Sequence, residues 1–63
     1  MNKFTLEINS ELMKIVKSNE SVLSIFRASL CTLFKAYRGK IIDNAEYEIE
    51  YSNLLYRCSL MSS

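Results

Sequence analysis

The stretch "DNAEYEIEY", residues 43–51, decides between a helical and a mixed fold. Its glutamates alternate with tyrosine and isoleucine, and a period of two is typical of a β-strand. Asp43 followed by Glu46, however, is a capping pair that opens helices. Glutamates in a first turn are stabilised by the positive end of the helix dipole, whereas three glutamates along one strand face repel one another. The stretch therefore predicts the start of a helix, with a strand as the alternative.

The residues after this stretch keep helical spacing to about residue 60. One side of the expected helix carries Tyr47, Tyr51, Leu54, Leu55 and Cys58, and another carries Ala45, Ile49, Tyr56 and Leu60. In the alternative, residues 46–60 are strands that turn at Ser52 and Asn53. Those two residues lack the glycine that tight hairpin turns prefer. We therefore predict a helix over residues 43–60.

A longer helix is predicted before it, over residues 10–38. Apolar residues recur at intervals of three and four, and Gly39 after the basic Lys35 and Arg38 predicts the helix end in a left-handed conformation. The residues expected to face another helix in self-association are Leu12, Asn19, Phe26, Leu30 and Leu33, with Phe26 central in the core. Asn19 either sets the register of a continuous helix or belongs to a break. The lack of glycine and proline there favours continuity.

The predicted fold is all-α, with helices over 10–38 and 43–60 forming an antiparallel hairpin in a single small domain over 1–63. A chain of 63 residues buries only about 60% of its unfolded surface, and a core of this size rarely supplies more than ~3–5 kcal/mol. We therefore predict a homodimer in which two hairpins form a four-helix bundle. The alternative is a small α+β fold with strands at 3–8 and 46–60.

The N-terminal segment "KFTLEIN", residues 3–9, also alternates between apolar and polar residues. A strand here would have to pair with its copy in a second chain. Followed by "SEL" at 10–12 and by a second helical segment from Ser21 to Leu30, it resembles the ribbon-helix-helix family of DNA-binding dimers. The resemblance implies a paired strand at 3–8 and a transcriptional regulator. In the alternative interpretation the segment extends the following helix backward.

The composition argues against catalytic and metal chemistry. The chain has no His and two Cys, whereas structural zinc uses four Cys or His ligands. A cysteine or serine nucleophile lacks a histidine base, and the alternating glutamates do not converge on one side of a helix. We predict no enzyme activity, no catalytic residue, no metal and no cofactor. Cys31 and Cys58 lie in apolar runs and are expected to be reduced, buried thiols.

The net charge of +1 conceals two blocks of opposite sign. The basic block is Arg27, Lys35, Arg38 and Lys40, and the acidic block is Asp43, Glu46, Glu48 and Glu50. Because they cancel, little field remains to attract phosphates, and a nucleic-acid partner is expected only in the ribbon alternative. The longest apolar run is too short to span a bilayer, and no secretory signal is recognised. We predict a cytoplasmic chain without a membrane partner.

Aromatic residues are concentrated in the C-terminal half of the chain. They are Phe34, Tyr37, Tyr47, Tyr51 and Tyr56. Tyrosine is enriched at protein interfaces because its ring buries area while its hydroxyl stays hydrogen-bonded. We predict that Tyr37, Tyr47, Tyr51 and Leu54 contact a protein partner, which the sequence does not identify. The predicted function is that of a small non-enzymatic interaction or regulatory module, of inhibitor, adaptor or chaperone type, acting through a helical, Tyr-rich surface.

Overall fold

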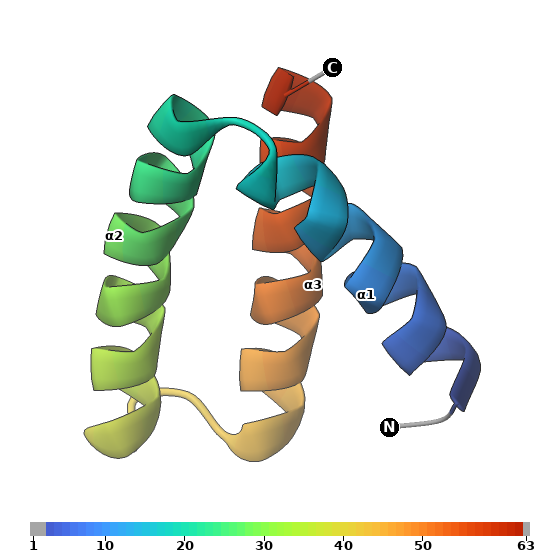
Figure 1. Ribbon diagram of the computed structural model, residues 1–63. Coiled ribbons are helices and arrows are strands. Elements are labelled where there is room, and N and C mark those ends of the chain that lie inside the picture. Colours follow the sequence, from blue (N-terminus) through green and yellow to red (C-terminus); the bar gives the residue numbers. More distant parts are fainter. Residues whose placement is uncertain (1–2, 63) are drawn as a thin grey trace.

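A computed structural model describes the backbone of residues 3–62 and the side chains of residues 8–62. That part of the chain forms three helices and no strand: α1 (Lys3–Lys17), α2 (Glu20–Arg38) and α3 (Asn44–Ser62). α2 and α3 run antiparallel, and α1 packs at an angle against both, mainly against α3 (Figure 1). The arrangement is flat, with Cα extents of 33 × 26 × 12 Å. The all-α prediction is confirmed.

The stretch at residues 43–51 forms the first turns of α3. The Oδ1 atom of Asp43 accepts a hydrogen bond from the Glu46 N–H at 2.8 Å, and the Asp43 carbonyl accepts one from the Tyr47 N–H at 2.9 Å. Asp43 thus satisfies a donor that the helix start leaves without an internal partner. The strand alternative for residues 46–60 is wrong because the cap commits the chain to a helix.

The prediction of one continuous helix over residues 10–38 is wrong, because Ser18 and Asn19 separate α1 from α2. The Ser18 hydroxyl donates to the Ile15 carbonyl at 2.6 Å, which closes α1. Asn19 is extended (φ −126°, ψ 105°), and its Oδ1 accepts from the Val22 N–H at 3.2 Å. Asn19 is therefore the N-cap of α2. Short polar side chains replaced the backbone partners at this break, so neither glycine nor proline was required.

The start of α1 settles the N-terminal alternative. Residues 3–8 are helical, so the alternative of a strand there is wrong. The paired ribbon on which the family resemblance depends is not formed in the described backbone. The interpretation in which this segment extends the following helix backward is confirmed. Lys14 and Lys17 lie in the last turn of α1, where the negative end of the helix dipole favours cations.

α2 ends at Arg38, as predicted, but the left-handed residue lies one position after Gly39. Gly39 has φ −78°, whereas Lys40 has φ 60° and occupies the left-handed region. The Lys40 N–H donates to the Tyr37 carbonyl at 3.1 Å, and the Ile41 N–H donates to the Ala36 carbonyl at 3.0 Å. This pair of bonds is the Schellman motif, in which the residue after the cap is left-handed. A lysine thus holds the conformation that was expected of Gly39.

The hydrophobic core lies at one end of the α2–α3 hairpin. Its buried members are Val16 of α1, Val22 and Phe26 of α2, and Leu55 and Cys58 of α3. They come from the C-terminal half of α1, the N-terminal half of α2 and the C-terminal half of α3, which meet at the top of Figure 1. We term this region the three-helix end. The prediction that Phe26 is a central core residue is confirmed.

The two cysteines have different surroundings, and both are free thiols. Cys58 is buried in the core, as predicted. Cys31 is exposed, so the prediction of a buried thiol is wrong there. Five residues of helix separate Cys31 from Phe26, which corresponds to a rotation of about 140° around the axis of α2. Cys31 therefore points away from the core that Phe26 enters.

Candidate protein-interaction surface

Four aromatic residues gather at the end of the hairpin opposite the core, close to the α2–α3 turn. They are Phe34 and Tyr37 of α2 and Tyr47 and Tyr51 of α3. Spacings of three and four residues place each pair on one side of its helix. We term these four residues the aromatic surface and this end of the hairpin the aromatic end. Phe34 is exposed, and the three tyrosines are half-buried.

Tyr47 is the centre of this ring cluster. Its ring centroid lies 4.7 Å from that of Tyr37 and 6.4 Å from that of Tyr51, and the Phe34 ring meets it edge-on at 6.5 Å. Tyr51 in turn meets Phe26 edge-on, with centroids 6.1 Å apart. Such ring pairs contribute about 0.5–1.5 kcal/mol each beyond area burial. The tyrosines that are predicted to contact a protein partner therefore also hold α2 against α3.

The polar atoms of the aromatic surface remain accessible. The hydroxyls of Tyr37, Tyr47 and Tyr51 form no hydrogen bond within the described part of the chain, and no unpaired polar side-chain atom in that part is buried. Each hydroxyl can therefore donate to and accept from a bound partner. Phe34 is 46% exposed, and the guanidinium carbon of Arg38 lies 5.9 Å from its ring centroid. Accessible rings, free hydroxyls and an arginine are features enriched at protein interfaces.

Two shallow hollows flank Tyr47. One has a volume of 290 Å³ and is lined by Arg27, Leu30, Cys31, Phe34 and Tyr47. The other has a volume of 260 Å³ and is lined by Asn44, Tyr47, Glu48 and Tyr51. Both hollows are smaller than the roughly 300–1,000 Å³ of typical small-molecule pockets. Their size and open form suit single side chains of a protein partner.

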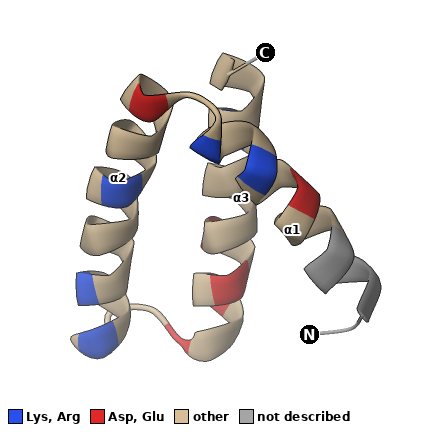
Figure 2. Ribbon diagram, in the orientation of Figure 1, with Lys and Arg blue, Asp and Glu red and all other residues tan. Residues whose placement is uncertain are grey.

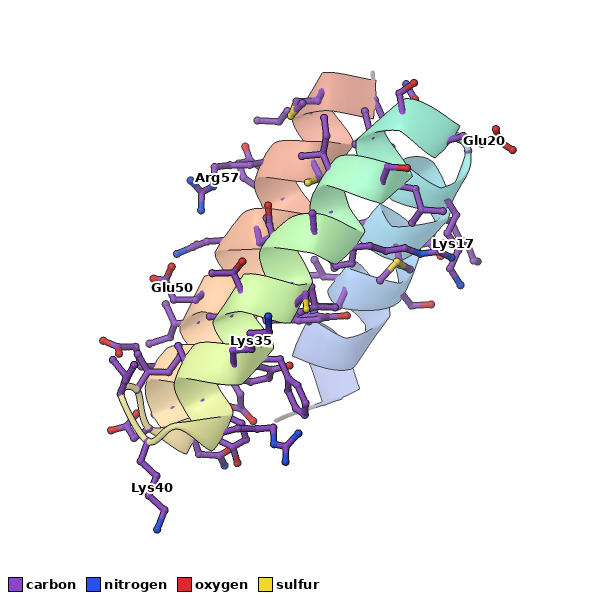
Figure 3. The ribbon with its side chains drawn as sticks, turned by 90° about the vertical axis from the view of Figure 1, so that its left-hand side faces the viewer. Lys17, Glu20, Lys35, Lys40, Glu50 and Arg57 are labelled. Carbon is purple, nitrogen blue, oxygen red and sulfur yellow. The ribbon has the colours of Figure 1, made fainter. Side chains whose placement is uncertain are left out.

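A third hollow, of 310 Å³, lies on another side of the hairpin. Ile25, Ser29 and Leu33 of α2 and Glu50, Leu54 and Arg57 of α3 line it. Figure 3 shows the side chains of Glu50 and Arg57 on one side of the hairpin and α1 on the opposite side. We term this hollow the hairpin groove. It leaves apolar side chains accessible, since Ile25 is 47% exposed and Met61, which also lines it, is 55% exposed.

The residues predicted to contact a partner are divided between these surfaces. Tyr37, Tyr47 and Tyr51 belong to the aromatic surface. Leu54 instead lines the hairpin groove and packs against the core. The structure thus brings together three of these side chains and separates the fourth from them.

The residues predicted for self-association are also dispersed. Phe26 lies in the chain's own core, and Leu12 and Leu30 pack against it. Asn19 is the α2 cap, and its Oδ1 is used within the chain. Leu33 lines the hairpin groove. Of the five, Leu33 is the residue placed in the groove.

Other residues of the two surfaces were not selected from the sequence. Phe34 was recognised as one of the aromatic residues but was not assigned to a site, although its spacing of three from Tyr37 was a usable signal. Ile25, Ser29 and Leu33 recur at intervals of four, which also indicates one helix side. What the sequence did not reveal is that this side of α2 stays uncovered by α1.

Charged residues surround the aromatic end with both signs. Figure 2 shows basic positions on the C-terminal half of α2 and acidic positions on the N-terminal half of α3. Among the side chains of residues 8–62, the one ion pair is Glu11–Lys14 within α1, at 3.2 Å. The basic and acidic blocks thus form no ion pair with each other there, and their charges remain available to a partner.

The described residues hold no group of three or more His, Cys, Asp or Glu side chains arranged to bind a metal ion. Within the described part of the chain, no helix combines the length and the apolarity that crossing a membrane would require. The chain matches no protein-family model, no curated protein and no solved structure.

Proposed function

We propose that this chain is a small non-enzymatic protein-interaction module that binds a protein partner through the aromatic surface. The observation that carries the proposal is the position of Tyr47, which is fixed by three neighbouring rings and lies between two hollows. A ring that is already held in place loses little conformational entropy on binding. Rigid aromatic residues of this kind are the usual anchors of protein interfaces.

The charged residues in the two hollows beside Tyr47 favour a partner that carries both acidic and basic groups. The hollow beside Cys31 has Arg27 in its lining, whereas the hollow beside Tyr51 has Glu48. A partner segment that crosses Tyr47 would thus meet a cation on one side and an anion on the other. Such complementarity gives orientation and specificity more than affinity. An inhibitor, adaptor or chaperone that works by occupying a surface fits this arrangement, and two free thiols fit the reducing cytoplasm.

Self-association is a second part of the proposal. The chain exposes 4689 Å² of accessible surface, whereas a compact monomer of 7.3 kDa exposes about 4,200 Å². Large apolar side chains account for part of this surface, among them Ile25 of α2 and Met61 of α3, which both line the hairpin groove. A further copy of the chain would cover apolar area that three helices leave in water.

Cys31 gives direct experimental access to the aromatic surface. Because Cys31 is exposed and Cys58 is buried, a maleimide carrying a benzophenone will label Cys31 selectively and place the photoreactive group in a hollow beside Tyr47. Irradiation in an extract of the native host, with and without nuclease, should give a cross-link to one protein that nuclease does not remove. An excess of unlabelled protein should compete for it.

Matched variants test whether the aromatic surface is responsible. Glu48→Arg places a long cation in the second hollow and should abolish the cross-link. Glu50→Arg makes the same charge change two residues away, outside both hollows, and should leave the cross-link intact. Equal cross-linking by both variants, or a cross-link that only nucleic acid supports, would contradict the proposal.

A further inference from the structure

We infer that a second copy of this chain docks in the hairpin groove, about a two-fold axis that passes at the height of Ser29 and crosses the helices at right angles. In the resulting four-helix assembly α2 packs antiparallel on α2 of the partner copy, and α3 packs antiparallel on α3. The inference rests on the self-association part of the proposed function and is independent of the aromatic surface.

The α2 side of the groove is symmetric about Ser29. Ile25 and Leu33 lie four residues before and after it, and all three line the groove. A two-fold axis at Ser29 therefore places Ile25 of one copy opposite Leu33 of the other, twice. The small serine at the centre allows the two α2 helices to approach closely. In an isologous interface each patch must be complementary to itself, and this pattern of large, small and large side chains fulfils that condition.

On the α3 side of the groove, charges of opposite sign lie above and below the height of Ser29. Glu50 and Arg57 both line it, and the point midway between them falls between Asn53 and Leu54. Antiparallel pairing about that point puts Glu50 of one copy opposite Arg57 of the other, again twice. Within the described residues neither side chain has an ion-pair partner, and the Arg57 Nε donates only to the Asn53 carbonyl at 3.5 Å. Both charges are thus available for pairing across the interface.

The centre of symmetry on α2, at Ser29, and the centre on α3, between Glu50 and Arg57, lie at the same height because of the hairpin geometry. α2 ends at Arg38 where α3 begins at Asn44, and the helices then run side by side. Ser29 lies nine residues from Arg38, and Asn53 lies nine residues from Asn44. Residues at equal distances from the turn lie at equal heights, so one axis serves both helices. An arrangement with α2 packed on α3 of the partner copy would use neither the symmetry about Ser29 nor the Glu50–Arg57 pairing.

The size of the face is adequate for a dimer of modest affinity. Each of the two helices has 19 residues, which at 1.5 Å per residue is about 28 Å. Two helices packed 8–10 Å apart present a projected face of roughly 500 Å². Two such faces bury on the order of 1,000 Å² in total, which is close to the lower limit of specific interfaces. Dissociation should therefore be measurable at micromolar concentrations.

Exchanging the charges of Glu50 and Arg57 tests whether α3 packs antiparallel on α3 of the partner copy. Sedimentation equilibrium of the full chain should show a dimer, and Glu50→Arg or Arg57→Glu alone should weaken it at least tenfold, because each places like charges opposite each other. The double variant restores opposite charges and should return the dissociation constant to within about threefold of the unmodified chain. Glu48→Arg, with the same charge change on another side of α3, should have no effect on dimerisation.

A cysteine at the axis provides a second, independent measurement. Ser29→Cys in a Cys31→Ser background places two thiols at the axis, within the roughly 7 Å between Cα atoms that a disulfide requires. Mild oxidation should give a covalent dimer quantitatively, whereas Ser24→Cys in the same background should not. A monomeric chain at tens of micromolar would overturn self-association altogether. A dimer that is insensitive to these groove substitutions would overturn this interface while leaving self-association in place.

Discussion

The two ends of the α2–α3 hairpin use apolar residues in different ways. At the three-helix end, aliphatic side chains from all three helices meet, and Val16 and Leu55 are both 0% exposed. At the aromatic end the core residues of α1 are absent, and rings from two helices pack on each other while remaining half in water. In both regions the sequence places apolar or aromatic residues at helical spacing.

The difference shows that coverage by a third helix decides whether an apolar residue becomes core or surface. Leu55 and Tyr47 lie on the same side of α3, yet among the side chains of residues 8–62 only Leu55 belongs to the cluster formed by all three helices. Large rings suit the uncovered end because each buries area against its neighbours while its hydroxyl reaches solvent. Stability should accordingly be concentrated at the three-helix end and binding at the aromatic end.

The largest effect is expected at the junction of the two regions. Phe26→Ala removes a buried ring from the core and its edge-on contact with Tyr51. The substitution should lower the free energy of unfolding by about 3–5 kcal/mol. A domain of this size would then be largely unfolded, as far-ultraviolet circular dichroism with urea titration will show. A loss below about 1 kcal/mol would contradict the placement of the core.

A smaller loss is expected at the aromatic end. Tyr47→Ala removes three ring contacts from a half-buried position and should cost about 2 kcal/mol. Tyr56 is the matched control, since it is a tyrosine of the same helix that is 55% exposed and outside the ring cluster. Tyr56→Ala should change stability by no more than about 0.5 kcal/mol. Equal losses would show that the ring cluster contributes nothing beyond helix formation.

The next loss of stability is expected at the junction between α1 and α2. Asn19→Ala removes the acceptor for the Val22 N–H and should destabilise the three-helix end by about 1 kcal/mol. Asn53→Ala, in the exposed middle of α3, removes no cap and should be neutral or slightly stabilising because alanine favours helices. Thermal unfolding of the two variants at one protein concentration gives the comparison. A stabilised Asn19→Ala chain would indicate that α1 and α2 fuse instead.

The last effect, a gain in stability, is expected at the α2–α3 turn. Lys40→Gly relieves a left-handed conformation that costs non-glycine residues about 1–2 kcal/mol, and it should stabilise the chain by about 1 kcal/mol. Gly39→Ala should bring no such gain, because Gly39 is not left-handed and its added Cβ would lie 3.2 Å from the Lys35 carbonyl oxygen, a tight contact that should cost no more than about 1 kcal/mol. A large loss of stability in Gly39→Ala, with no gain in Lys40→Gly, would instead indicate that Gly39 is the left-handed residue.

Sequence patterns located the helix of residues 43–60 because its signals are local. Asp43 and Glu46 are three residues apart, and the hydrogen bond they predict is present. Gly39 likewise marked the end of α2, although the left-handed residue is Lys40. The break at Ser18 and Asn19 was missed because a heptad pattern runs through it, and an asparagine fits both a core position and a cap. Local pattern does not distinguish these two roles.

The two surfaces were harder to predict because they depend on how the helices rotate against each other. Two sides of α3 are apolar in sequence, and either could have faced α2. The structure buries the side with Leu55 and Cys58 and leaves Ile49 and Leu60 exposed. Which side of a hairpin stays uncovered then depends on where α1 packs, and that choice is made by contacts between residues far apart in the chain.

The stacking around Tyr47 gives the aromatic end an optical signal of its own. The chain contains four tyrosines and no tryptophan, and three of the tyrosines are in contact. Coupled tyrosine transitions in a fixed environment should dominate the near-ultraviolet circular dichroism, whereas the far-ultraviolet signal reports the helices as a whole. Excitation energy will also pass between the three rings, which lowers the polarisation of their fluorescence. Opening of the aromatic end can therefore be followed in the unlabelled protein while the three-helix end remains folded.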